Sequence, residues 1–183
     1  VTDKKANRRK WRNPSLVNGY SDHEDAMEWS EYTEWQKSIL AECWRCLTPN
    51  GAIYYQHKPR HHAEGVILPL AYATPEMTLR QIITWARDGG INFNPAFYMP
   101  TTEWVVVWAK TKWRLKSNAA SGAGDVWRFS QAPSWHPAPF PLALATRALE
   151  TVMPSLVVDP FMGSGTTAKA AVKLGIDYIG FEL

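Results

Sequence analysis

Residues 157–182 read VVDPFMGSGTTAKAAVKLGIDYIGFE, and this stretch decides the fold of the chain. The apolar run that ends at Val158 predicts a short strand, which stops at Asp159. A glycine-rich turn follows, then a helix-forming run over 166–174, and then a second strand that ends in Glu182. A strand, tight turn, helix and strand in this order are typical of a parallel βαβ unit with a ligand at the turn.

The small residues of the turn and the acid beyond it indicate the kind of ligand. Gly163 and Gly165 permit a tight turn and a close approach of the backbone to a ligand. Ala168 stands where a third small residue lets the helix pack on the strand. Glu182 follows the turn by roughly twenty residues, where a carboxylate accepts hydrogen bonds from a ribose. We therefore predict a site for an adenosine-type cofactor, with a glycine turn that only caps a helix as the alternative.

Two other cofactor classes fit the turn less well. A phosphate-binding P-loop requires Gly-Lys-Ser/Thr, but Gly165 is followed by the threonines 166–167, and Lys169 comes too late. A nicotinamide site usually lacks the Asp-Pro-Phe that stands here at 159–161. A nicotinamide oxidoreductase is therefore the least favoured function.

The segment 159–167, DPFMGSGTT, resembles the S-adenosylmethionine-binding segment of site-specific DNA amino-methyltransferases. This family methylates the exocyclic nitrogen of adenine or cytosine. Three upstream segments extend the resemblance to the family's permuted β class, in which the catalytic half precedes the cofactor half. They are 46–53 (CLTPNGAI), 103–110 (EWVVVWAK), and 125–127 (DVW) followed by 136–141 (HPAPFP), so the similarity covers about residues 28–183.

The resemblance implies a set of roles in cofactor binding. Phe161 and the turn that follows it would shape the pocket around the methionine part of the cofactor. Asp159 would receive the ammonium group, Glu182 the ribose hydroxyls, and the helix N-terminus at 165–167 the carboxylate. The full set of implied cofactor-binding residues is Asp159, Pro160, Phe161, Gly163, Ser164, Gly165, Thr166, Thr167, Glu182, His136, Pro137, Phe140 and Pro141.

The family's catalytic loop, Asp/Asn/Ser-Pro-Pro-aromatic, is absent from the sequence. The nearest match, NPAF at 94–97, lacks the second proline and follows the strand that Gly51 introduces, so a proline turn between strands is the alternative. We name no catalytic residue. We expect either a fragment incomplete at both ends or an internal deletion near Asp3, and no turnover from this chain alone. A catalytically inactive DNA- or nucleotide-binding remnant of the family is the alternative function.

The fold class predicted from these patterns is α/β, a Rossmann-like, circularly permuted methyltransferase sheet that is incomplete at both ends. We expect the sheet to be mostly parallel, with crossovers on both faces. The predicted organisation is a basic or polar arm over 1–28 and a methyltransferase domain over 29–183. Within that domain, 29–110 forms the catalytic half, 111–124 a linker loop, and 125–183 the cofactor-binding half.

Hydrophobic periodicity predicts the remaining elements. They are a helix over 31–47 capped by Ser30, a buried strand over 52–56, a short helix over 64–73 broken by Pro69, a strand over 104–108, a small-residue loop over 117–124, and a helix that Pro141 opens, with Leu142, Ala145, Leu149 and Val152 on one face. Periodicity is ambiguous over 79–85, where the strand character of residues 82–85 and the family resemblance imply a strand.

Positive charge is concentrated at the start of the chain, although the net charge is only +3. The basic residues of this arm are Lys4, Lys5, Arg8, Arg9, Lys10 and Arg12. Such a cluster can neutralise phosphates. We predict a contact with double-stranded DNA, whose target base would be flipped out of the duplex. A solvated charged arm is the alternative.

Composition sets the broad class. A length of 183 residues corresponds to about one domain, and a hydrophobic content of 45% excludes wholesale disorder. No apolar run approaches the roughly 18 residues needed to span a bilayer. The charged N-terminus lacks an apolar signal segment, so we expect a cytoplasmic location.

The cysteines and histidines superficially resemble a zinc site. Cys43 and Cys46 precede His57 and His61 at a spacing close to that of a zinc finger. The cysteines fall within a predicted helix, and an apolar strand separates them from the histidines, so we predict no metal site and two buried thiols in a reducing compartment. The histidines are expected to form a polar strand exit, and the acidic run 22–25 a solvated loop.

Overall fold

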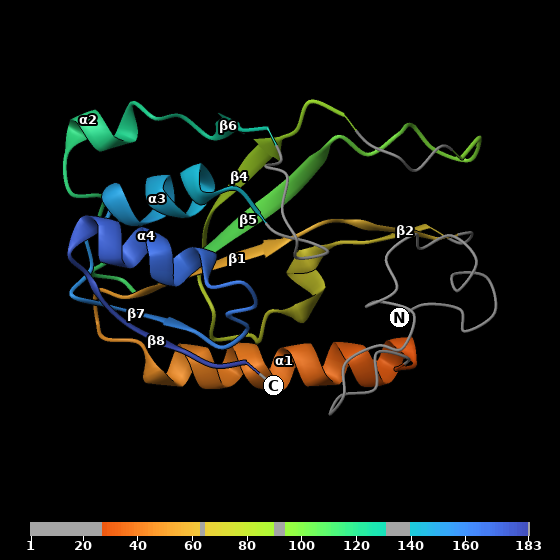
Figure 1. Ribbon diagram of the computed structural model, residues 1–183. Helices are drawn as coiled ribbons and strands as arrows, with labels where there is room; N and C mark the ends of the chain where they lie inside the picture. The colour runs from red at the N-terminus through yellow and green to blue at the C-terminus, as the bar shows by residue number, and fades with distance from the viewer. Residues whose placement is uncertain (1–26, 63–64, 90–93, 131–139, 183) are drawn as a thin grey trace.

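The computed structural model describes residues 27–62, 65–89, 94–130 and 140–182 (Figure 1). Helices and strands alternate along most of the chain. In order they are α1 (Trp29–Cys46), β1 (Ala52–His57), β2 (Arg60–His62), β3 (Gly65–Ile67), the 3-10 helix η2 (Pro69–Tyr72), β4 (Leu79–Ala86), β5 (Thr102–Ala109), α2 (Asn118–Ser121), β6 (Val126–Arg128), α3 (Leu142–Glu150), β7 (Leu156–Asp159), α4 (Thr166–Leu174) and β8 (Asp177–Gly180).

The central sheet has four strands in the order β1-β5-β4-β6. β5 is antiparallel to both β1 and β4, whereas β4 and β6 are parallel. The expectation of a mostly parallel sheet is therefore wrong for these strands, because β4 and β5 form a hairpin and so run in opposite directions. Since β1, β4 and β6 run in the same direction, their carboxyl ends lie at one edge of the sheet.

One face of this sheet packs on α1 and η2. Leu40 and Trp44 of α1 and Tyr72 of η2 form a buried cluster with Val106 and Trp108 of β5. Burial of each large apolar side chain stabilises the fold by roughly 1.5–3 kcal/mol. The apolar face of α1 is thus fixed against the sheet.

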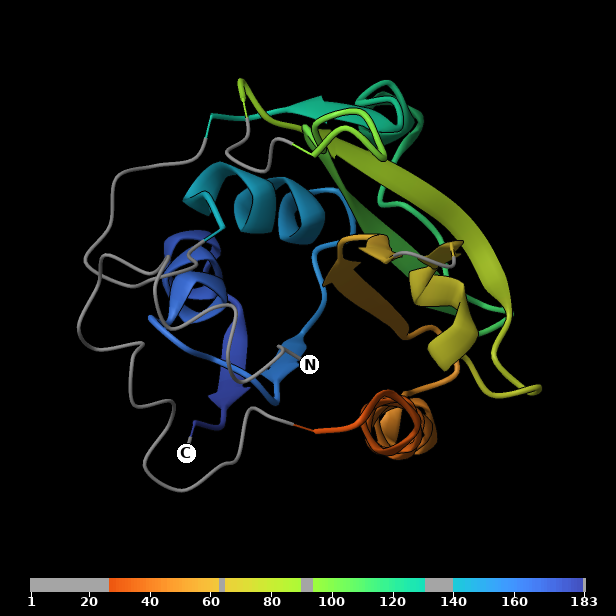
Figure 2. The same ribbon diagram turned by 90° about the vertical axis from the view of Figure 1, so that its right-hand side faces the viewer.

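The opposite face packs on α3. Val105 and Val107 of β5 join Trp85 of β4, Trp127 of β6 and Leu144 of α3 in a second buried cluster. In Figure 2, α1 lies on one side of β1, and α3 and α4 lie on the other. β5 is therefore buried on both faces, which explains why its sequence is a continuous apolar run and not an alternating one.

A second, smaller sheet pairs β7 with β8 in parallel. α4 connects these two strands and packs on α3. The contact uses small residues: Ala170 and Ala171 of α4 are fully buried against Ala145 and Leu149 of α3 and Ile176. The βαβ unit predicted from the sequence is confirmed, and its helix spans 166–174 as predicted.

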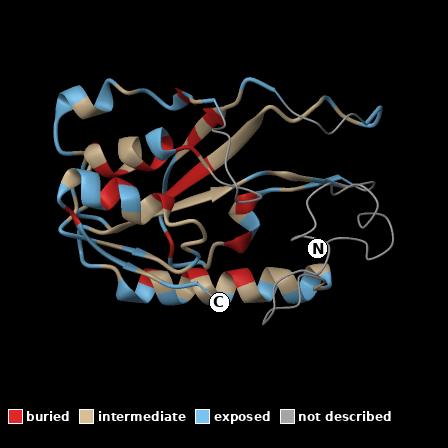
Figure 3. Cartoon of the chain, in the orientation of Figure 1, coloured by how far each residue is buried: buried red, intermediate tan, exposed pale blue. Residues whose placement is uncertain are grey.

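The β7–β8 pair leaves apolar side chains uncovered. Leu156, Val158 and Ile179 are each about half exposed, and Figure 3 shows much of β7 and β8 in the colour of exposed residues. β7 is therefore much less buried than β5, although both sequences are apolar.

Several predicted element boundaries need correction. α1 begins at Trp29 with Glu28 as its N-cap and no side-chain cap bond, so Ser30 lies inside the helix and does not cap it. Residues 65–72 form a strand and a single 3-10 turn in place of a short helix. Pro69 explains this, because its ring allows a helix to start but not to continue through it.

The predicted loop over 117–124 contains the short helix α2, whose N-cap Ser117 accepts a hydrogen bond from the Ala120 N–H. Pro141 is the N-cap of α3, so the helix begins at Leu142, one position after the predicted start. Leu144 lies on the buried face of α3, whereas Leu142, which was predicted to lie there, is exposed. Among the helices in the described ranges, none is long and apolar enough to cross a membrane.

Candidate functional site

The turn after β7 depends on two glycines with left-handed backbone. Gly163 has φ 52° and Gly165 has φ 74°, and L-residues with a side chain rarely adopt such values. Gly165 is the N-cap of α4, and a Cβ at this position would meet nothing within 4 Å. The backbone conformation, and not crowding, therefore requires glycine at 165, and the space over the start of α4 is open.

Hydrogen bonds fix the turn to the end of β8. The Met162 N–H donates to the Phe181 carbonyl at 2.9 Å, and the Phe181 N–H donates to the Asp159 carbonyl at 3.0 Å. The Asp159 carboxylate accepts from the Phe161 N–H at 3.0 Å, which forms an Asx turn. The Gly165 N–H donates to the Met162 carbonyl at 2.9 Å, so the turn is closed on itself as well.

Glu182 lies directly at this turn. Its Oε2 accepts a hydrogen bond from the Gly163 N–H at 2.6 Å, across 19 positions of sequence. The sequence analysis expected the second strand to end in Glu182, but β8 ends at Gly180. The acid and the glycine turn are brought together as predicted. One carboxylate oxygen is engaged with the backbone of the turn.

Met162 packs against the end of β8. A Cβ at Gly180 would lie 3.0 Å from Met162 Cγ and closer still to Met162 Sδ. The absence of a side chain at 180 therefore leaves room for Met162 under the turn. The sequence analysis did not identify this pair, and the only signal was a glycine inside a strand.

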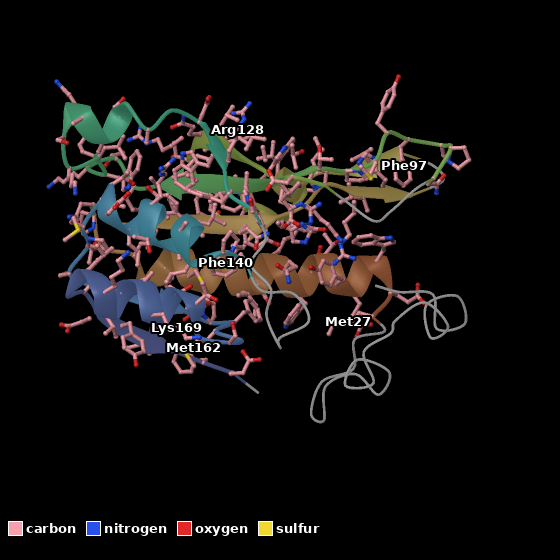
Figure 4. All side chains as sticks on the ribbon, turned by 45° about the horizontal axis from the view of Figure 1, so that its top comes forward. Met27, Phe97, Arg128, Phe140, Met162 and Lys169 are labelled. Atoms are coloured by element: carbon pink, nitrogen blue, oxygen red, sulfur yellow. The ribbon has the colours of Figure 1, made fainter. Side chains whose placement is uncertain are left out.

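Polar side chains also stabilise the start of α4. Lys169 Nζ donates to the Ser164 carbonyl at 3.1 Å, and the hydroxyls of Ser164 and Thr166 lie 3.3 Å apart. Thr166 is buried, whereas Thr167 is partly exposed. Lys169 comes too late for a P-loop, yet its charge reaches back to the glycine turn (Figure 4).

Phe161 links the turn to α1. Its ring, half exposed, meets Trp35 edge to face with 5.5 Å between centroids. Nothing in the sequence indicated that these two rings meet. The contact places α1 beside the candidate cofactor turn.

The second predicted wall of the site is only partly described. Phe140 is partly buried and packs against the clusters on both sides of α3, and Pro141 is buried. His136 and Pro137 lie outside the described residues. So do the basic residues of the predicted arm, Lys4, Lys5, Arg8, Arg9, Lys10 and Arg12.

An aromatic cluster lies at the carboxyl end of β1. His57 stacks on Tyr55 at 5.4 Å and meets Tyr72 edge to face at 5.4 Å. His57 Nδ1 donates to the Lys58 carbonyl at 2.7 Å, so its neutral Nε2 accepts from the Tyr32 hydroxyl at 3.1 Å. Burial lowers the pKa of His57 to about 4. The expectation that His57 belongs to a polar strand exit is therefore wrong.

Arg60 covers the open side of this cluster. Its guanidinium lies 5.6 Å from the centre of the Trp29 ring and 5.4 Å from that of Tyr32. Burial raises the pKa of Tyr32, although the Arg60 charge opposes the shift. The Tyr55 hydroxyl donates to Gln36 at 2.7 Å.

The cysteines do not form a metal centre with the histidines. Cys43 is half-buried and Cys46 is exposed, so the expectation of two buried thiols is wrong for Cys46. Burial raises the pKa of the Cys43 thiol. In the part of the chain that the structure describes, no three His, Cys, Asp or Glu side chains gather as metal ligands.

The nearest match to the family's catalytic loop is a surface turn. Asn94 Oδ1 accepts from the Ala96 N–H at 2.9 Å, and Asn94 bridges to Phe97. This geometry agrees with the proline-turn alternative. Two cavities of about 320 and 310 Å³ lie elsewhere, and neither is lined by a residue of the glycine turn.

Comparison with known proteins places these features in a family. A family model described as DNA methylase matches residues 5–183. The type II methyltransferase M.BglII of Bacillus subtilis is 28% identical over 210 residues, an alignment that covers 93% of this chain and 58% of that protein. The chain thus spans less than two thirds of the length of this relative.

Two solved structures share the fold. The PvuII DNA methyltransferase, described as cytosine-N4-specific, superposes with a TM-score of 0.73 at 18% identity, and 90% of this chain and 70% of that chain are covered. TTHA0409 of Thermus thermophilus, in complex with S-adenosyl-L-methionine, gives a TM-score of 0.62 at 20% identity, with 84% and 72% covered.

Gly180→Ala should destabilise the chain through Met162. We expect a loss of about 1–3 kcal/mol in the free energy of unfolding, because the new methyl group overlaps the Met162 side chain. Combining it with Met162→Ala should recover part of the loss, and urea unfolding of the four proteins measures this coupling. Gly89→Ala is the matched control, since a Cβ there meets nothing within 4 Å. Additive effects at 162 and 180 would contradict the contact.

The stability of the chain should fall as His57 is protonated. The unfolded chain binds a proton near the ordinary pKa of 6.5, while the folded chain excludes it until about pH 4. This contribution is therefore complete above pH 6.5 and is lost as the pH drops toward 4, with an upper bound of about 3 kcal/mol. Urea unfolding above and below this window should show a larger loss for the wild type than for His57→Gln. Equal losses would contradict a buried neutral His57.

Proposed function

Because the chain belongs to the DNA methylase family, we propose that its glycine turn binds S-adenosyl-L-methionine for methyl transfer to an exocyclic amino group of adenine or cytosine in DNA. The hydrogen bond between the Gly163 N–H and Glu182 carries this proposal. It joins a left-handed glycine turn and an acid across a βαβ unit, the arrangement expected for an adenosine-type cofactor. The cofactor-bound state of TTHA0409, a protein of the same fold, adds support.

The turn offers complementary groups for the cofactor. The first N–H groups of α4 lack partners within the helix and suit a carboxylate, and the Lys169 charge adds to their positive potential. Glu182 keeps one oxygen for ribose hydroxyls, and Asp159 keeps one for the ammonium group. The half-exposed Phe161 ring offers an apolar surface beside them. When bound, the cofactor would supply an electrophilic methyl group, which these residues would orient.

The DNA partner is proposed to be double-stranded. An amino group within the base stack cannot approach the methyl group, so the target base has to be extruded. The division into a catalytic half over 29–110 and a cofactor half over 125–183, as well as a cytoplasmic location, belongs to the same proposal. A non-catalytic DNA- or nucleotide-binding role is the second candidate, because the sequence has no Pro-Pro-aromatic loop.

Glu182→Ala should weaken cofactor binding by roughly 1–3 kcal/mol, because ribose hydroxyls and the Gly163 N–H lose their acceptor. Titration calorimetry with S-adenosyl-L-methionine measures the change, and NAD should give no binding to the wild type. Asp177→Ala removes an exposed carboxylate from β8, the strand that leads to Glu182, and should leave the affinity unchanged. An unchanged affinity in Glu182→Ala would remove Glu182 from the site.

The 183-residue chain should bind the cofactor without catalysing methyl transfer. The reason is that no segment of the sequence matches the Pro-Pro-aromatic loop that holds the target amine in this family. Incubation with labelled S-adenosyl-L-methionine and duplex DNA of mixed sequence, followed by counting of label in the DNA, tests this expectation. Robust incorporation would show that other residues of the chain hold the base.

A further inference from the structure

Residues 94–101, which lead into β5, project beyond the sheet. Figure 1 shows these residues extending, together with β2, beyond the carboxyl end of β1. Figure 4 shows Phe97 near the far end of this segment. A projecting element there is placed to meet a macromolecule that extends past the carboxyl edge of the sheet.

The projecting turn is well supported. The Phe97 N–H donates to the Asn94 carbonyl at 3.3 Å, and the Phe97 ring stacks on His61 of β2 with 4.7 Å between centroids. At the base of this segment, Arg87 donates to the Pro100 carbonyl at 3.0 Å. Pro95 further restricts the backbone. The backbone that carries Tyr98 is therefore restrained.

Tyr98 presents its ring on this support. It is 99% exposed, more than any other large apolar side chain in the described ranges. Its neighbour Phe97 is partly buried against β2. Of these two adjacent rings, Phe97 therefore packs on the protein, whereas Tyr98 projects into solvent. A scattered exposed aromatic residue needs no explanation, but this one stands on a hydrogen-bonded turn that projects beyond the carboxyl end of β1.

The charges around the base of the projection favour a polyanion. Lys58 and Arg60 follow β1, and residues 58–62 and 94–101 contain no acid. The nearby Glu103 is neutralised by Arg87 at 3.0 Å, and Asp88 accepts a hydrogen bond from Ser130. A positive base with an aromatic tip is the combination that binds unpaired nucleic acid through phosphate attraction and base stacking.

We propose that Tyr98 is a stacking residue for DNA. Its ring stacks on an unpaired base of the opened duplex, while Lys58 and Arg60 attract the flanking phosphates. This inference rests on the proposed function, since it requires a duplex that is opened over the glycine turn. It adds a contact that neither the cofactor site nor the N-terminal basic arm provides.

Fluorescence anisotropy with two labelled duplexes tests the proposal, one fully paired and one with a single unpaired 2-aminopurine. The wild type should prefer the second duplex and quench its 2-aminopurine fluorescence. Tyr98→Ala should lose about 5-fold to 100-fold in affinity for that duplex, together with the quenching, because the stacking contact is gone. Tyr98→Phe should retain both. Tyr178→Ala, which removes a half-exposed tyrosine from β8, is the matched control.

Equal affinities of Tyr98→Ala and the wild type for the unpaired duplex would overturn the proposal. An equal loss of affinity for both duplexes would also overturn it. So would the absence of DNA binding by the wild type, in which case the exposed ring would fit a protein partner instead. Calorimetry with S-adenosyl-L-methionine on the same samples separates this failure from that of the proposed function. Because Tyr98 is fully exposed, the variants should unfold at the same urea concentration as the wild type.

Discussion

The left-handed backbone at Gly163 and Gly165 is the constraint on which the candidate site depends. It reverses the chain between β7 and α4 so tightly that the N–H of Gly163 points to a carboxylate 19 positions away. The same reversal leaves the first turn of α4 uncovered, because no side chain projects from Gly165. A residue with a Cβ atom at either position would force the backbone out of the left-handed region. The open N-terminus and the position of Glu182 would then be lost together.

The sequence analysis was most successful where burial and backbone geometry are local. The βαβ unit over 156–180 follows from strand and helix periodicities that meet at glycines, and its helix was predicted to the residue. The strand at 104–108 was predicted for a related reason, since a run of apolar residues this dense is stable only when both faces are covered. The exposed β7 shows the limit of that argument, because an apolar strand is buried only where another layer packs on it.

Features that depend on distant segments could not be predicted. The contact between Phe161 and Trp35 and the packing of Met162 on Gly180 join residues whose sequences carry no sign of each other. His57 is the clearest case. A histidine beside Lys58 and Arg60 suggests a polar exit, yet packing against the rings of Tyr55 and Tyr72 partly buries it and makes the charged form costly. The direction of the strands could not be predicted for a similar reason, since composition does not reveal which strands pair.

Two carboxylates of the site each stabilise the turn with one oxygen and leave the other free. Asp159 Oδ1 accepts from the Phe161 N–H, and Glu182 Oε2 accepts from the Gly163 N–H. Both groups are therefore oriented before a ligand arrives, which lowers the entropy that binding has to offset. The same carboxylates thus hold the turn and face the proposed ligand. A substitution that loosens the turn would therefore also displace the oxygen that is proposed to bind the ligand.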